Sequence, residues 1–347
     1  MFISLSFGQE KGLFINQEEA GRIRRYLNNF DLLLRSYEEI RDKVDREIVE
    51  IIVPLPGEAG SYAHQRHKLN GWLVRNAGIL YLITGEEKYL RFISDILLRY
   101  ADMYPKLSAN PFSKSSAPGK IFHQMLNEAV WLTDVIIGYD CVKSKLSSGL
   151  RVHLIKNLFI PMVEWFSVKN EHEFNRIHNH GTWAVAAVGM TGYAIGDTLM
   201  VKKALYGTGL DGKGGFLMQL KKLFSPDGYY IEGPYYARYA IQPFYLFAEC
   251  IERNQPELKI FAYRDSILKK AVYALLQVTY PNGVFPPLND ASRTMSIRNE
   301  SVILAVDIAL YRYGLFEDKN MLSVVKFQNR VVLHEAALHI VEVLGNL

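Results

Sequence analysis

The residues best suited to chemistry near the middle of the chain are an adjacent amide and imidazole, Asn179 and His180. They precede the apolar stretch Thr182–Ile195, whose residue spacing predicts a helix. The N-terminus of a helix presents free backbone N–H groups and a partial positive charge, which favour a nearby anion. The pair is therefore suited to binding a carboxylate, although simple capping and packing of the helix would explain it as well.

A second candidate is the segment Ser225–Tyr239, which contains five tyrosines. Tyr236 and Tyr239 are three residues apart and Tyr235 and Tyr239 four apart, so a helix would present two phenols on one face. The pKa of tyrosine is ordinarily about 10, and a cation such as Arg238 or a protonated histidine would lower it. The segment indicates either a proton-transferring tyrosine or an aromatic platform for a sugar.

Two further stretches resemble a nucleotide-binding loop and a zinc-protease motif, but neither has the residues that those functions need. Gly207–Gly214 has the glycine spacing of a phosphate-binding loop, but Gly214 stands where a serine or threonine would hold magnesium. His172 and His178 are too far apart for the HExxH zinc motif, which needs both imidazoles on one helix face. A histidine-rich loop could still bind a metal, but we assign no metal ligand and expect no cofactor.

Helical periodicity dominates the elements that must position these residues. Alternating strand patterns are nearly absent; only Ile48–Val53 hints at a strand, and the end of a helix would explain it equally. We therefore expect an all-α fold, either a solenoid or a closed α/α toroid of antiparallel helical hairpins, with chemistry in the loops at one end. The expected helices are Asn70–Leu82, Lys88–Tyr104, Ile121–Tyr139, Ser148–Phe166, Thr182–Ile195, Gly215–Phe224, Tyr239–Arg253, Leu268–Thr279 and Ser301–Tyr313. The expected loops are Pro56–Lys68, Ser108–Lys120, Glu171–Gly181, Ser225–Tyr239 and Tyr280–Arg293.

Composition narrows the class of protein. The chain has 347 residues, 49% of them hydrophobic and 22% charged, which is typical of a globular protein with a large core. A net charge of +4 is too small to indicate nucleic-acid binding, and no apolar run reaches the length of a membrane span. The two cysteines, Cys141 and Cys250, are too few for a disulfide scaffold and read as buried thiols.

Residues 1–8 are apolar and lack a basic segment, so they resemble the end of a secretory signal peptide, although a disordered start would look similar. If the first interpretation holds, residues 9–347 form the mature helical domain and the protein is periplasmic or secreted.

Three strings resemble a known family. Asn175–Asp197 (NRIHNHGTWAVAAVGMTGYAIGD), Gly119–Asp140 (GKIFHQMLNEAVWLTDVIIGYD) and Ser225–Ala240 (SPDGYYIEGPYYARYA) closely resemble the oligoalginate lyases of polysaccharide lyase family 17. They are similar, more distantly, to the heparinase II/III-like lyases. The resemblance covers about residues 60–300 and implies an N-terminal α/α toroid and cleavage of uronic-acid oligosaccharides by β-elimination.

The resemblance also implies roles for single residues. Asn179 and His180 would neutralise the uronate carboxylate, and Tyr236 would be the catalytic acid or base. Side chains that would bind the substrate are Gln124, Asn127, Arg238, Tyr239, His64, His67 and Lys68. The expected partner is an acidic oligosaccharide or polysaccharide, and alginate is the preferred candidate.

One departure from the family is large. Family members continue into a β-sandwich domain that supplies a second tyrosine, a histidine and arginine contacts, whereas this sequence ends at Leu347 in a helical pattern. The chain would thus be an incomplete toroid, either lacking part of the active site or naturally truncated. We expect it to bind acidic oligosaccharide weakly and to turn it over poorly or not at all.

Other functions stay open at this point. A tyrosine-lined toroid without catalysis could bind acidic carbohydrate, and a heparinoid could replace alginate as the substrate. Hydrolysis is disfavoured because Asp227, Glu232 and Asp290 show no spacing typical of an acid/base pair.

Overall fold

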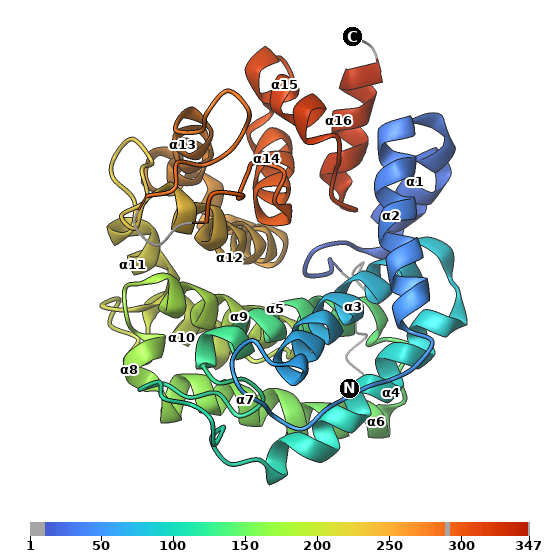
Figure 1. Ribbon diagram of the computed structural model, residues 1–347, viewed down its shortest axis with the longest axis vertical. Coiled ribbons are helices and arrows are strands. Elements are labelled where there is room, and N and C mark those ends of the chain that lie inside the picture. Colours follow the sequence, from blue (N-terminus) through green and yellow to red (C-terminus); the bar gives the residue numbers. More distant parts are fainter. Residues whose placement is uncertain (1–10, 289–291, 346–347) are drawn as a thin grey trace, which may run out of the picture.

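Helices wind around a ring in the computed structural model, which describes residues 11–288 and 292–345 (Figure 1). The interpretation of residues 1–8 as a signal-peptide remnant, and with it the extracytoplasmic location, lies outside the described residues and stays a prediction. The longer α-helices are α1 (Gln17–Tyr26), α2 (Asp31–Glu47), α3 (Tyr62–Thr84), α4 (Glu87–Met103), α5 (Met125–Val142), α9 (Asn179–Ile195), α10 (Thr198–Tyr206), α11 (Gly215–Lys222), α12 (Pro234–Asn254), α13 (Tyr263–Gln277), α14 (Glu300–Tyr313), α15 (Lys319–Gln328) and α16 (Glu335–Gly345). Short helices α6 (Ser148–Leu154), α7 (Ile160–Glu164) and α8 (Glu171–Phe174) complete the ring.

The helices form two layers. In the inner layer α3 packs on α5, α5 on α9, α9 on α12, and α12 on α14. Helices α3, α5, α9 and α14 bury side chains on nearly every face, and those of α3 include polar residues such as His67, Asn70 and Arg75. The outer layer includes α4, α10, α13 and α15, each packed against its inner neighbour. The inner layer therefore places its side chains around the centre of the ring.

Glycines let the inner helices approach closely. A Cβ atom on Gly138 would lie 2.2 Å from the carbonyl oxygen of Val74, and one on Gly78 would lie 2.8 Å from the Cα atom of Gly138. Because real Cβ contacts are never that short, α3 and α5 could not keep this spacing with larger residues. The spacing sets the position of Trp131 and Asp134, which α5 presents near the ring centre.

The first and last helices of the described residues meet and close the ring. Helix α16 contacts both α1 and α2, so red and blue ribbons lie side by side in Figure 1. Arg253 of α12 pairs with Glu19 of α1 at 2.6 Å, and it also reaches the fully buried Glu249. Glu249 is bonded in turn by Arg312 and His334. A buried charge held by several partners is costly to break, so this network locks the closure.

The predicted all-α fold is confirmed. The described residues contain isolated bridges at Phe224–Tyr230 and Val284–Ser296 but no strand, and Ile48–Val53 follows the end of α2 without forming one. Three predicted loops are shorter than expected. Helices α3 and α12 begin within two of them, at Tyr62 and Pro234, and the loop predicted at Glu171–Gly181 contains α8 and the start of α9. Among the described helices, none is both long and apolar enough to cross a membrane.

Candidate active site

Asn179 opens helix α9 and is bonded to a carboxylate of the protein itself. Its side-chain Nδ2 donates to Glu232 Oε2 at 2.7 Å, and its backbone N–H donates to Glu232 Oε1 at 3.3 Å. The helix N-terminus thus attracts an anion, as the sequence predicted, but that anion is Glu232. The hydroxyl of Tyr230 also donates to Glu232 Oε1, at 2.9 Å.

His180 is held by a second carboxylate. Its Nδ1 donates to Glu173 Oε1 at 2.7 Å, and Glu173 is buried on α8 with Arg176 as a further partner at 3.3 Å. The hydrogen bond from His180 lowers the pKa of Glu173, so this carboxylate is ionised at neutral pH. With Nδ1 engaged, the Nε2 atom is the part of the imidazole left to act on a ligand.

His178 connects the two carboxylate groups. It is the N-cap of α9, and its Nδ1 accepts from the backbone N–H of His180. Its Nε2 lies 3.5 Å from Glu232 Oε2, and its ring stands nearly perpendicular to that of His180 with centroids 4.9 Å apart. Burial is the main reason that the pKa of His178 is lowered, although Glu232 opposes the shift. Sequence reasoning did not assign His178 to the site.

The first turn of α12 carries the tyrosines and the arginine. Gly233 precedes the helix with φ of 84°, a left-handed conformation that glycine adopts readily, and Pro234 starts it. The rings of Tyr235 and Tyr236 are nearly perpendicular with centroids 5.2 Å apart. The guanidinium of Arg238 lies 4.7 Å from the centre of the Tyr235 ring.

We expected Arg238 to lower the pKa of a nearby tyrosine, but the pKa of Tyr239 is raised. Burial raises the pKa of Tyr239, and the opposing effect of Arg238 is smaller. Burial also lowers the pKa of Arg238 itself. Tyr239 packs instead against Trp183 of α9, with ring centroids 5.2 Å apart, so it is a neutral, positioned aromatic side chain.

A cleft of about 440 Å³ opens along α3, α5, α9, α12 and α14. Four of the predicted substrate-binding residues line it together: Lys68, Asn127, Arg238 and Tyr239. The other charged or aromatic side chains of the lining are Lys43, Trp72, Arg75, Trp131, Asp134, Trp183 and Glu300. We call this space the central cleft.

The lining of the central cleft includes polar atoms that lack partners. Asn127 Oδ1, Trp183 Nε1 and Arg238 Nε are buried and make no hydrogen bond within the described part of the chain. Unsatisfied buried polar groups are rare in folded proteins, so each needs an explanation. Two donors and one acceptor along one cleft are what a sugar with hydroxyl and carboxylate groups would satisfy.

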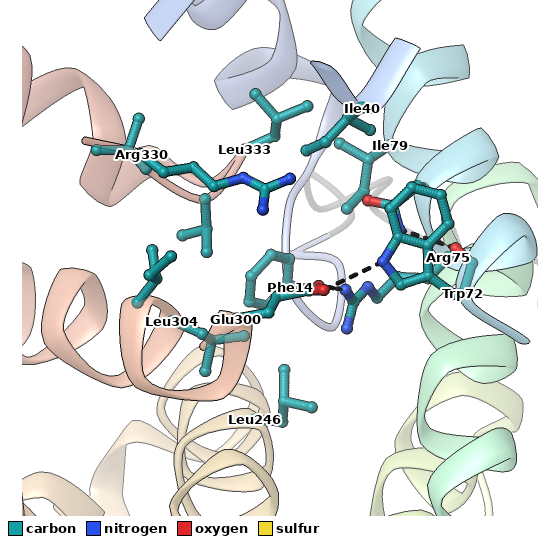
Figure 2. A pocket seen from close by; sticks show the side chains of 14 residues that line it. Phe14, Ile40, Trp72, Arg75, Ile79, Leu246, Glu300, Leu304, Arg330 and Leu333 are labelled. Carbon is teal, nitrogen blue, oxygen red and sulfur yellow. Dashed lines mark hydrogen bonds and ion pairs between the residues drawn. The ribbon is translucent and has the colours of Figure 1, made fainter. Parts of the chain in front are cut away.

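Arg75 of α3 lines the central cleft and ties α3 to α5 and α14, and Figure 2 shows it beside Trp72 and Glu300. Its Nη1 donates to Asp134 Oδ1 of α5 at 2.8 Å, and its Nη2 pairs with Glu300 at the start of α14. Trp72 Nε1 donates to the other oxygen of Glu300 at 3.2 Å. Trp72, Arg75 and Glu300 also line a small apolar pocket beside Phe14 and Leu246, so they form the wall between that pocket and the cleft.

Three other predicted substrate contacts lie away from the lining of the central cleft. His67 is completely buried, with Nδ1 2.8 Å from the Tyr100 hydroxyl, and burial lowers its pKa to about 3. His64 is buried beside Phe122, and its pKa is lowered to about 4, again mainly by burial. Gln124 stands at the N-cap of α5. His67 has no exposed surface with which to touch a sugar.

The predicted site residues thus fall into two groups. Asn179 and His180 are gathered at the start of α9 by Glu232 and Glu173, whereas Lys68, Asn127, Arg238 and Tyr239 share the central cleft. Helices α9 and α12 connect the groups, because α9 carries Trp183 one turn after Asn179, and α12 carries Tyr236 beside Arg238. Convergence of Asn179, His180 and Tyr236 on one sugar stays a prediction.

Among the described residues, no three His, Cys, Asp or Glu side chains are grouped so that they could hold a metal ion. The residues that sequence reasoning missed are Glu173, His178, Lys43, Trp72 and Trp183. Glu173 and His178 contact His180 within the same short segment, so the sequence around Asn179 offered a local signal for them. Lys43, Trp72 and Trp183 contact side chains of other helices, which no local pattern indicates.

The chain is thus a ring of helices around a cation-lined cleft, and solved structures of other proteins share the ring fold. A crystal structure of an alginate lyase from Bacteroides ovatus superimposes with a TM-score of 0.65, covering 96% of this chain and 99% of that one at 13% identity. Alginate lyase A1-III from Sphingomonas species A1 superimposes with a TM-score of 0.56, covering 88% of each chain at 14% identity. At these identities the likeness establishes the fold, an α/α toroid.

Sequence comparison gives the family. Residues 55–283 match the family described as alginate lyase, and the chain belongs to that family. It is 43% identical over 335 residues to an exo-oligoalginate lyase from Saccharophagus degradans, covering 96% of this chain and 45% of the relative. It is 45% identical over 296 residues to an alginate lyase from Stenotrophomonas maltophilia, covering 85% of this chain and 39% of the relative. The chain therefore spans less than half the length of these two relatives.

Proposed function

We propose that this chain carries the toroid of an oligoalginate lyase of polysaccharide lyase family 17, which cleaves uronic-acid oligosaccharides by β-elimination. The observation that carries the proposal is that a helix begins with Asn179 and His180 near a cleft lined by Lys43, Lys68 and Arg238. These three cations form no ion pair with any carboxylate of the described residues. Membership of the alginate lyase family and the two relatives support it.

The first requirement of the reaction is to neutralise the substrate carboxylate. Removing the proton from C5 of a uronate places additional negative charge on the attached carboxylate, so cations and hydrogen-bond donors must face that group. His180 is suited to this because Glu173 holds its Nδ1 and leaves Nε2 for the ligand. A single well-placed donor of this kind contributes about 10²–10³ in rate.

The second requirement is proton transfer. A base removes the proton from C5, the bond between C4 and O4 breaks, a C4–C5 double bond forms, and the departing O4 takes up a proton. Tyr236, on the first turn of α12 beside Arg238, is assigned one or both transfers. Such general acid–base groups contribute about 10²–10⁴ each. No water enters the products, which separates this reaction from hydrolysis.

The engagement of Asn179 by Glu232 is the observation that favours the second candidate, a non-catalytic carbohydrate-binding toroid. In the proposed enzyme, the substrate carboxylate must share or replace this contact. A heparinoid as the substrate is the remaining alternative, and a panel of alginate and heparinoid oligosaccharides distinguishes the two polymers.

Product analysis tests the proposal. The chain is incubated with alginate tetrasaccharide, and unsaturated end groups, which absorb ultraviolet light, are counted against new reducing ends. Elimination yields one unsaturated end for each new reducing end. Reducing ends without unsaturated ends would indicate a hydrolase, and tight binding without either product would indicate a binding protein.

A further inference from the structure

The central cleft holds more positive charge than its own carboxylates neutralise. Lys43, Lys68, Arg75 and Arg238 line it, against Asp134 and Glu300. Both carboxylates are bonded to Arg75. Within the described part of the chain, no carboxylate forms an ion pair with the other three cations. Unpaired cations that face one cleft favour an anionic ligand with several charges.

The cations lie on two walls of the cleft. On one wall Lys68 and Trp72 are four residues apart on α3, so they share a face, and Lys43 of α2 approaches the same face. On the other wall Arg238 belongs to α12, which is separated from α3 by the inner helices α5 and α9.

Lys43 is held in place by Trp72. Its ammonium lies 3.9 Å from the centre of the Trp72 ring, and the indole is fixed by its hydrogen bond to Glu300. The ring covers one side of the ammonium, and burial lowers the pKa of Lys43. A cation that has lost part of its water and is already positioned binds an anion at a lower entropic cost than a free lysine.

We propose that Lys43, Lys68 and Trp72 form a second uronate-binding subsite on the wall opposite Arg238. The inference rests on the proposed function, because a polyuronate offers one carboxylate per sugar and would place successive carboxylates along the cleft. Lys43 and Lys68 bind the carboxylate of the second sugar, and the indole edge contacts its ring. The subsite selects oligomers with acidic residues beyond the sugar that reacts.

The experiment measures binding of a saturated alginate tetrasaccharide by calorimetry, using the full chain with Tyr236→Phe to prevent turnover. Adding Lys43→Met should raise the Kd about tenfold, equal to about 1.4 kcal/mol, and Lys43→Arg should restore most of the affinity. Lys326→Met, on the exposed surface of α15, is the matched control and should leave the Kd unchanged. A carboxyl-reduced, neutral tetrasaccharide should bind with the same low affinity whether or not Lys43 is present.

A cation–π contact that only joins α2 to α3 would give a different pattern. In that case Lys43→Met would lower the melting temperature without a selective loss of the charged ligand, and the proposal would be overturned. Lys68→Met, at an exposed position, repeats the binding test if Lys43→Met does not fold. An unchanged Kd in both variants, or no binding by any variant, also overturns it.

The outcomes separate this subsite from the proposed reaction. If the tetrasaccharide binds in a Lys43-dependent way but the chain with Tyr236 intact forms no unsaturated ends, the subsite stands and the proposed elimination fails. If unsaturated ends form at equal rates with and without Lys43, and the Kd is also unchanged, the elimination stands and the subsite fails.

Discussion

Glu173 controls His180 more directly than any other described residue. It is buried, its carboxylate accepts from His180 Nδ1, and its lowered pKa shows that the folded protein favours the ionised form. An ionised carboxylate on one imidazole nitrogen fixes the ring and stabilises positive charge on it. Glu173 is therefore a positioning residue that acts through His180.

Replacing Glu173 with Gln should keep the shape of the contact but remove its charge. We expect the rate of elimination to fall by about 10- to 100-fold, below the full contribution of about 10²–10⁴ of an acid–base group. The loss should appear in the rate more than in the stability, because His180 loses the carboxylate that holds its ring. Kinetics and thermal unfolding of Glu173→Gln measure both effects. An unchanged rate with only a lower melting temperature would show that Glu173 is merely structural.

His64 and His67 predict how stability depends on pH. Their folded pKa values, about 4 and about 3, are below the ordinary value of about 6.5 because burial disfavours their charged forms. Between these values the unfolded chain binds more protons than the folded one. Their contribution is thus complete above about pH 6.5 and is lost as the pH falls towards 4 and below.

Urea unfolding at pH 7 and pH 4.5 measures this loss. His64→Gln should reduce the difference in unfolding free energy between the two pH values, because glutamine does not titrate. The exposed His172 provides the control, since His172→Gln should leave the difference unchanged. A difference that is the same in wild type and His64→Gln would contradict the assignment.

The sequence indicated which side chains belong to the candidate site, but not which other side chains they contact. Asn179 and His180 do open a helix, as the apolar pattern after them indicated, because helix starts have local signals. Glu232, 53 residues away, could not be paired with Asn179 from sequence, since the ring alone brings the two together. The same holds for Trp72 and Glu300, which are 228 residues apart.

Two helices that carry residues of the cleft differ from the sequence prediction. Helix α2, which supplies Lys43, was not predicted, although its buried residues Tyr37, Ile40 and Val44 have the spacing of an amphipathic helix. The segment around Tyr236 was expected to be a loop, but Gly233 and Pro234 start α12 within it. The tyrosines therefore sit on a rigid helix, which suits residues that must hold a fixed geometry.

Arg75 is the main polar link between α3, α5 and α14. Burial raises the pKa of Asp134, and Arg75 opposes that shift, so Asp134 depends on this partner. Arg75→Met should lower the free energy of unfolding by about 3–5 kcal/mol, since it leaves a buried carboxylate unpaired. Glu300→Gln should cost about 1 kcal/mol or less because Glu300 is partly exposed.

Urea unfolding of both variants measures the two costs. Combining Arg75→Met with Asp134→Leu should recover much of the stability, because the stranded carboxylate is removed as well. Equal losses for Arg75→Met and Glu300→Gln would contradict the dependence of Asp134 on Arg75.

The whole molecule explains why the cleft exists. Its walls come from helices far apart in sequence, and the contacts of α16 with α1 and α2 hold them in a ring. Periodicity was enough to predict an all-α fold, because helical patterns are local, and the resemblance of three strings to a known family indicated the toroid. The grouping of cations at the centre was not predictable, because a net charge of +4 says nothing about where charges gather.

The central claim is that Tyr236 transfers protons to or from a sugar whose carboxylate is held by His180. The most direct measurement compares, for Tyr236→Phe and wild type, the rate of unsaturated end-group formation and the Kd for alginate tetrasaccharide. We expect the rate to fall at least about 100-fold, the lower limit for losing an acid–base group, while the Kd changes less than about threefold because the carboxylate contacts are intact. A Tyr236→Phe rate close to that of wild type, or a rate loss matched by an equal loss of binding, would contradict the account.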